Sequence, residues 1–144
     1  MCMGTCVVVD REYITRVLGA NPEKGVHALE PLAALAQQTG FPMKILEDTQ
    51  IFNDAEVHLT EGDLWFCIEG IARLIYGGEL FNAQCRKQAD GSDNPQELFA
   101  AEIKNGTEIE LHPGDWLWVP AGQPHQHGST GTARLGIIKI PKVA

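Results

Sequence analysis

Long hydrophobic runs are missing from this sequence of 144 residues. The apolar patch near its start, Cys6 to Val9, is followed at once by the charged residues Asp10, Arg11 and Glu12. Such a patch is too short for the core of a secretory signal and far too short to span a bilayer. We therefore expect a cytoplasmic protein that has no membrane as its partner.

Positive charge is also scarce. The chain has 11 Lys and Arg against 19 Asp and Glu, which gives a formal net charge of −8 at pH 7. Nucleic acids and anionic membrane surfaces bind proteins that carry a basic patch. The composition argues against both, and a small molecule or another protein is the expected partner.

Cysteines are few and show no zinc-ligand spacing. The four are Cys2, Cys6, Cys67 and Cys85. We predict free thiols of a reducing compartment, with a disulfide between Cys2 and Cys6 as the alternative. The 44% hydrophobic and 7% aromatic content is typical of a soluble globular protein, and the length suits a single domain.

The first 40 residues are predicted to be helical. Asp10 can cap a short amphipathic helix that ends near Gly19. A second helix is expected from Pro31 to about Gly40, and it has no charge over Pro31 to Gln38. We expect this segment to pack on the rest of the chain, and the second helix to assist a dimer contact.

Beyond residue 40, the pattern changes to short segments rich in β-branched and aromatic residues, separated by glycine and proline. Such a pattern is typical of a β-sandwich or barrel. A polar loop is expected over Asp90 to Pro95, either over the barrel mouth or on the surface. The predicted strands are Met43 to Phe52, Ala55 to Thr60, Leu64 to Glu69, Ile71 to Tyr76, Leu98 to Ile103, Thr107 to His112, Trp116 to Pro120 and Thr132 to Ile140.

The stretch from Gly114 to His125 organises the sequence. It reads GDWLWVPAGQPH: a turn, a short strand, and then a break at Pro120 and Gly122 just before His125. Proline fixes its own φ and glycine accepts a positive φ, so this loop can hold the imidazole at a modest entropic cost. A plain hairpin turn with a surface histidine would explain the same residues.

The spacing of this stretch, Gly, five residues, Pro, one residue, Gly, two residues, His, resembles the second signature motif of the cupin superfamily. Upstream, Glu56, His58, Asp63 and Gly70 fall on the spacing of that family's first motif. Glu56 stands where the family has its first histidine, and Asp63 stands where a glutamate is usual. The two motifs together span about half of the chain.

The resemblance implies an all-β fold, a cupin-type double-stranded β-helix or jelly-roll barrel, with a short helical segment at the N-terminus. The expected division is a helical segment over residues 1–40, packed on a barrel over residues 41–144. Cupins also commonly pair through their barrel faces, so the resemblance implies a homodimer.

Strand alternation places Glu56 and His58 on one face of their segment. If the two motifs face each other across a barrel, as they do in cupins, Glu56, His58, Asp63 and His125 converge and are candidate metal ligands. A buried cluster of two imidazoles and two carboxylates needs a counter-charge, which a divalent cation supplies.

Each candidate ligand has a second interpretation. Glu56 could instead form an ion pair with Arg73 or Arg134. Asp63 could be a turn residue, because its neighbourhood, GDLW, repeats the GDWL that begins at Gly114.

His127 is the spare imidazole and our candidate catalytic residue. It could replace Asp63 as a ligand, move a proton, or face solvent. The aromatic residues Trp65, Trp116 and Trp118 are predicted to be mostly core between two sheets.

A carboxylate in place of an imidazole favours a harder metal. Manganese is the first hypothesis and iron the second, with nickel or zinc as further divalent ions that such sites bind. Three functions follow: a metal-dependent isomerase, epimerase or lyase, which is the preferred one, an iron(II) dioxygenase, or a non-catalytic module that senses a ligand or metal.

Overall fold

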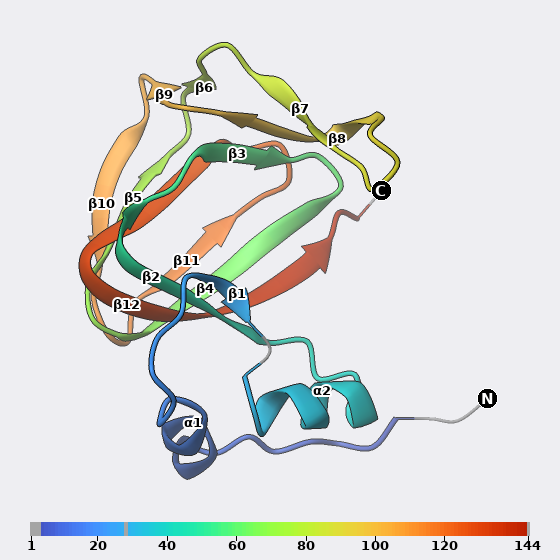
Figure 1. The fold of residues 1–144 in the computed structure, drawn as a ribbon, viewed down its shortest axis with the longest axis vertical. Coiled ribbons are helices and arrows are strands. Elements are labelled where there is room, and N and C mark those ends of the chain that lie inside the picture. Colours follow the sequence, from blue (N-terminus) through green and yellow to red (C-terminus); the bar gives the residue numbers. More distant parts are fainter. Residues whose placement is uncertain (1–3, 28, 144) are drawn as a thin grey trace.

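A computed structural model describes residues 4–27 and 29–143. Strands dominate it, which confirms the all-β prediction, and the main sheet curls around a central space (Figure 1). No helix in the described ranges is long and apolar enough to cross a membrane. The elements are α1 (Arg11–Val17), β1 (Gly25–His27), α2 (Leu32–Thr39), β2 (Lys44–Phe52), β3 (Ala55–His58), β4 (Glu61–Glu69), β5 (Ala72–Tyr76), β6 (Glu79–Leu80), β7 (Gln84–Lys87), β8 (Asp93–Ala100), β9 (Ile103–Lys104), β10 (Thr107–Leu111), β11 (Trp116–Val119) and β12 (His125–Pro141).

The long strand β12 joins the two halves of the curled sheet. Its first residues pair with β3 and β5, and its later residues pair with β2 and β4, all antiparallel. The register with β2 shifts between Ser129 and Thr132, where a bulge lets the strand bend from one half into the other. Both ends of β12 therefore border the same interior.

That bend makes β12 longer than predicted. The sequence predicted a strand from Thr132 to Ile140, but the strand begins at His125. Gly128 is needed for packing: a Cβ there would lie 2.3 Å from the carbonyl oxygen of Ile51 in the neighbouring strand. The glycine marks a close approach of two strands.

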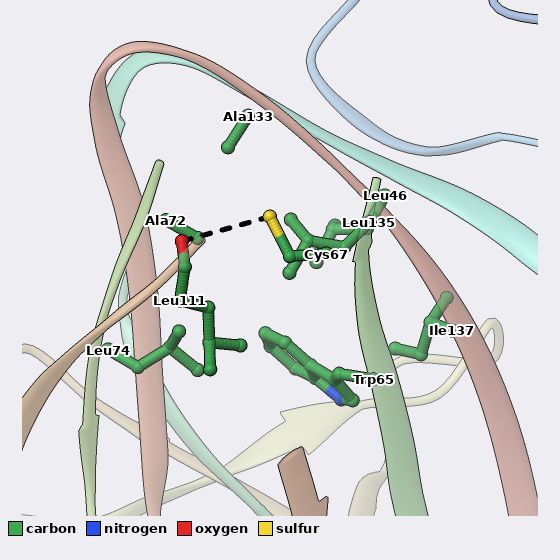
Figure 2. Packing of buried hydrophobic residues seen from close by; sticks show 9 residues of the cluster. All are labelled: Leu46, Trp65, Cys67, Ala72, Leu74, Leu111, Ala133, Leu135 and Ile137. Carbon is green, nitrogen blue, oxygen red and sulfur yellow. Dashed lines mark hydrogen bonds between the residues drawn. The ribbon is translucent and has the colours of Figure 1, made fainter. Parts of the chain in front are cut away.

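The interior between the two halves holds an apolar core, which Figure 2 shows from close by. Trp65 and Cys67 point into it from β4 with the same parity as Asp63, as predicted. The Cys67 thiol donates to the carbonyl oxygen of Leu111 at 3.7 Å. The buried members are Leu46, Trp65, Cys67, Ala72, Leu74, Leu111, Ala133, Leu135 and Ile137.

The two helices lie against the outside of the barrel beneath β1 and β2 (Figure 1). Asp10 caps α1 by accepting from the Tyr13 amide at 2.8 Å, and α2 ends at Gly40 in the left-handed region. Val17 and Leu32 from the helices are fully buried with Ile45 of β2. The helices thus cover one face of β2 while the barrel interior covers the other.

Some predictions about the surface were wrong. Trp116 and Trp118 are 61% and 49% exposed, because they lie on β11, which pairs only with β4, and face outward. The region of Asp90 to Pro95 is part of a hairpin: β8 already begins at Asp93, between β3 and β7. Cys2, and with it the proposed disulfide, lies outside the described residues, while Cys6, Cys67 and Cys85 are free thiols.

A buried ion pair fastens the N-terminal segment to the barrel. The Arg134 side chain, 2% exposed as a residue, donates from Nε to Glu47 at 3.0 Å and from its other nitrogens to the carbonyl oxygens of Leu18 and Ala20. Arg134 therefore has a structural role, because its side chain is hydrogen-bonded to these partners. Its alternative role as the partner of Glu56 is not observed.

We expect Arg134→Met to lower the free energy of unfolding by about 3–5 kcal/mol, because the buried Glu47 carboxylate loses its guanidinium partner. Urea denaturation followed by circular dichroism measures this change. Arg73→Met is the matched control, since Arg73 pairs with Glu108 on the exposed surface and little change is expected there. Equal stabilities of the two variants would contradict a stabilising role for the ion pair between Arg134 and Glu47.

Candidate metal centre

Three strands bring the predicted ligands to one point of the interior. Glu56 and His58 come from β3, Asp63 from β4 and His125 from the start of β12. Glu56 and His125 are direct cross-strand neighbours in the register of β3 and β12. The loop before His125 turns at Gly122, whose φ is +86° and whose amide donates to the carbonyl oxygen of His58 at 2.8 Å. The motif loop is therefore tied directly to the strand that carries the other histidine.

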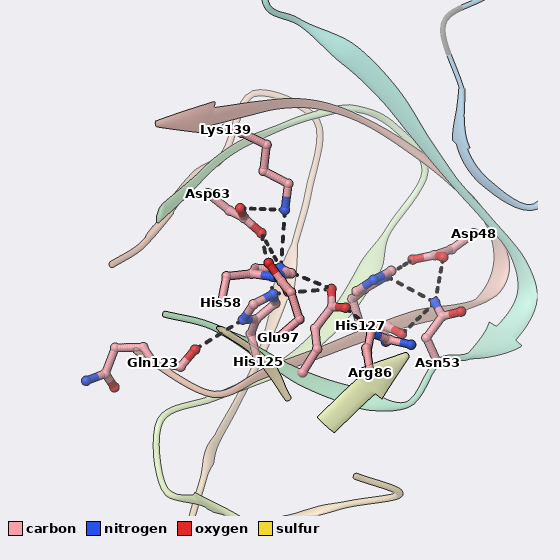
Figure 3. A network of polar contacts seen from close by, with 11 residues as sticks. Asp48, Asn53, His58, Asp63, Arg86, Glu97, Gln123, His125, His127 and Lys139 are labelled. Carbon is pink, nitrogen blue, oxygen red and sulfur yellow. Dashed lines mark hydrogen bonds and ion pairs between the residues drawn. The ribbon is translucent and has the colours of Figure 1, made fainter. Parts of the chain in front are cut away.

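The side chains of His58, Asp63 and His125 point toward one another (Figure 3), and Glu56 lies beside the two histidines. Glu56 Oε1 lies 3.6 Å from Nε2 of His58 and 3.4 Å from Nε2 of His125. Asp63 Oδ2 lies 3.5 and 3.4 Å from the same two nitrogens. The structure thus brings together all four residues that the sequence singled out as ligands.

This arrangement fits a divalent cation. Ligands about 2.1 Å from a tetrahedral ion are about 3.4 Å apart, close to the observed spacings. Among the described residues, Asp63 Oδ2 and His125 Nε2 are buried atoms with no hydrogen-bond partner. Leaving such atoms unsatisfied is costly, and a shared cation would satisfy both. The donors of Glu56, His58 and His125 also lie within 4.8 Å of one another, as a metal site requires.

The electrostatics of the metal-free cluster show how strongly these groups interact. Burial alone would lower the pKa of His125, but the Asp63 and Glu56 carboxylates raise it to about 9. Burial would likewise lower the pKa of His58, which Glu56 and Glu97 raise. The pKa of Glu56 is lowered by His125 and His58 against the opposing effect of burial. In metal-free protein a proton on His125 therefore supplies positive charge to these carboxylates.

Asp63 has a basic partner of its own. Lys139 is its cross-strand neighbour on β12, and its Nζ donates to Asp63 Oδ1 at 2.7 Å. The same Nζ lies 3.2 Å from His58 Nε2. Burial would raise the pKa of Asp63, but His125 and Lys139 lower it. The three donors that all lie within 4.8 Å of one another are those of Glu56, His58 and His125.

Two further residues support the ligands, and no pattern in the sequence indicated either. Glu97 on β8 is the cross-strand neighbour of His58 and contacts its Nδ1. This contact fixes Nδ1 as the protonated nitrogen and leaves Nε2 as the donor to a metal. Arg86 on β7 donates to Glu56 Oε2 at 3.2 Å, so the ion pair of Glu56 is with Arg86 and not with Arg73 or Arg134.

Glu97→Gln is expected to weaken metal binding by about 10–100-fold, because an amide at this position holds the His58 tautomer less firmly than a carboxylate. Isothermal titration with Mn²⁺ measures the change. Glu108→Gln is the matched control: Glu108 pairs with Arg73 on the exposed surface and belongs to neither group of possible metal donors. Glu97→Gln with unchanged affinity would exclude the orienting role.

His127 lies apart from the four convergent atoms. Its Nδ1 contacts Asp48 at 2.6 Å, and the Asn53 amide donates to the other oxygen of Asp48 at 2.9 Å. The Trp65 ring meets His127 edge-on at 4.9 Å between centroids and His125 at 5.8 Å. The His127 residue is 7% exposed, and its ring is held by the buried carboxylate of Asp48. Its role as a catalytic residue stays a prediction.

The remaining histidine that the structure describes in full is a surface residue. His112 is half exposed and has Glu110 and Asp115 beside it. Asp115 accepts from the His112 amide at 2.8 Å, which is the turn role that was the alternative for Asp63.

No family model matches the chain, and no curated protein matches its sequence. Solved structures do match its fold. YcfD from Escherichia coli has a TM-score of 0.54 at 19% identity, over 71% of this chain and 26% of that one, so the chain spans about a quarter of YcfD. A protein from Thermus thermophilus has a TM-score of 0.54 at 18% identity, over 94% and 98% of the two chains. Hydroquinone 1,2-dioxygenase from Sphingomonas sp. TTNP3 has a TM-score of 0.55 at 13% identity, over 98% and 83%.

The chain has the cupin fold. The two cupin motifs of the sequence occupy β3, β4 and the entry to β12, where their polar side chains meet inside the barrel. Identities below a fifth support the fold and no particular activity. The possible metal centre of this chain therefore has to be interpreted from its own residues.

Proposed function

We propose that this cupin is a divalent-metal-dependent enzyme that acts on a small molecule, with Glu56, His58 and His125 as its metal ligands. The convergence of the donors of these three residues within 4.8 Å of one another, with the buried Nε2 of His125 lacking a hydrogen-bond partner, carries the proposal. When bound, the ion would supply Lewis acidity, or dioxygen activation in the case of iron(II).

The residues around the ligands would prepare them for this task. Glu97 orients His58, and Arg86 compensates the charge of the Glu56 oxygen that points away from the histidines. Asp63, held by Lys139, would place a second carboxylate beside the centre. Manganese is our first proposal for the metal and iron our second, because the donor set mixes carboxylate with imidazole.

For the reaction, our first proposal is an isomerase, epimerase or lyase, in which the ion polarises a carbonyl or hydroxyl group of the substrate. Such a reaction also needs a group that moves a proton. His127 is a proposal for this task, supported by its buried contact with Asp48, which fixes the proton on Nδ1.

One observation favours an iron(II) dioxygenase as a second candidate. The three donors that lie within 4.8 Å of one another are two histidines and one carboxylate, and such triads leave coordination positions open for substrate and oxygen. Hydroquinone 1,2-dioxygenase, one of the proteins with a similar fold, is an oxygenase by name. Hydroquinone is therefore a reasonable first substrate to test.

The test begins with elemental analysis of untagged protein purified without added metal or chelator. Near-stoichiometric manganese or iron is expected. Oxygen uptake by iron-loaded protein with hydroquinone then separates the candidates, because an isomerase or lyase consumes no oxygen. Folded protein that stays metal-free after loading would exclude a metalloenzyme and favour a non-catalytic binding module.

A further inference from the structure

Lys139 lies beside the candidate metal centre and is partly exposed. Its side chain is 40% exposed, whereas those of Asp63 and His125 are each 1% exposed. Figure 3 shows the side chain reaching from β12 toward His58 and Asp63. The ammonium group is therefore within reach both of solvent and of the buried cluster.

The hydrogen bonds of this ammonium group leave donors for a ligand. An ammonium has three N–H groups. One donates to Asp63 Oδ1, and Nζ also lies 3.2 Å from His58 Nε2. A metal ion held by His58 Nε2 would replace this second contact. Lys139 would then have N–H donors that Asp63 does not use, while its bond to Asp63 keeps Nζ close to the centre.

We propose that Lys139 determines substrate class: it selects a small molecule that presents a carboxylate to the metal centre. One carboxylate oxygen would face the ion, and the other would accept a charge-assisted hydrogen bond from Nζ. A neutral amide or ester cannot form this bond with the same strength. This inference rests on the proposed function, since it requires the metal centre of Glu56, His58 and His125.

The test uses protein loaded with Co²⁺, whose visible absorption changes when a ligand binds, and acetate as the probe. Acetate is expected to bind the wild type, and acetamide at least tenfold more weakly. Lys139→Met is expected to weaken acetate binding by about tenfold or more, because a charge-assisted hydrogen bond is lost. Lys142→Met, on the exposed segment just after β12, is the matched control and should bind acetate like the wild type.

The cobalt content of every sample separates the two proposals. Lys139→Met that holds Co²⁺ and binds acetate as tightly as the wild type overturns the inference and leaves the metal centre standing. Wild-type protein that takes up no Co²⁺ overturns both. If the Met variant does not hold cobalt, Lys139→Gln replaces it, because the amide can still donate to Asp63 without a charge. The same loss of acetate binding is expected for it, and wild-type affinity would overturn the inference.

Discussion

His125→Ala is expected to lower the affinity for Mn²⁺ at least a hundredfold. The reason is that His125 Nε2 is a buried donor without a hydrogen-bond partner in the described chain, so the variant loses one of the three proposed ligands. Loss of a ligand should exceed the 10–100-fold effect that is typical of residues behind the ligands. Elemental analysis of purified protein and titration with Mn²⁺ measure the change.

His112→Ala is the matched control for this variant. This substitution also removes one imidazole, but His112 is half exposed and lies outside the cluster. It should keep the metal content of the wild type. A folded His125→Ala protein with a full equivalent of metal would show that the convergence of these side chains has a structural purpose only.

The second large effect is on stability against pH in metal-free protein. The folded-state pKa of His125 is raised to about 9 from an ordinary value of 6.5. The stabilisation that this shift represents is fully present below pH 6.5 and is lost as the pH rises toward 9. We expect the free energy of unfolding to fall by up to about 3 kcal/mol over this range. Urea denaturation at a series of pH values, with EDTA present, measures it.

The carboxylates act in the opposite direction. The pKa values of Glu56 and Asp63 are lowered, so their stabilisation is present above their ordinary values, near pH 4, and is lost on acidification. Metal-free protein should therefore be most stable between about pH 5 and pH 6.5. In His125→Ala the decline above pH 6.5 should shrink markedly. If the free energy of unfolding of the wild type does not change between pH 6.5 and 9, the interaction of His125 with these carboxylates is contradicted.

The same titration predicts how metal binding depends on pH. A metal must displace the proton of His125. The apparent affinity for the metal should therefore rise by up to tenfold for each unit by which the pH increases, until the pH reaches about 9. Mn²⁺ titrations between pH 6 and 8 test this. An affinity that does not change with pH would mean that His125 is already neutral in the metal-free protein.

The positions of the ligands could be predicted because they depend on local patterns. The period-two alternation that places Glu56 and His58 on one face also turns Asp63, Trp65 and Cys67 inward. The turn at Gly122 could likewise be predicted, since few other residues accept its positive φ.

The partners of the ligands could not be predicted in this way. Glu97 meets His58, and Lys139 meets Asp63, only because β8 aligns with β3 and β12 with β4 in a particular register. These pairs are 39 and 76 residues apart in the chain. A register between distant strands is a tertiary property, and a one-residue slip would send every one of these side chains to the other face. For the same reason, the exposure of Trp116 depends on β11 being an edge strand.

The pairing of β12 also governs how the protein is made on the ribosome. This strand follows every other described strand in the chain, yet it pairs with β2, β3, β4 and β5. Until it emerges, those strands expose unpaired edges, which are sites of misassociation in a nascent chain. Closure then has to bridge long sequence separations, which makes it slow. Because His125 is on the same strand, the four candidate ligands can come together only once the barrel has closed.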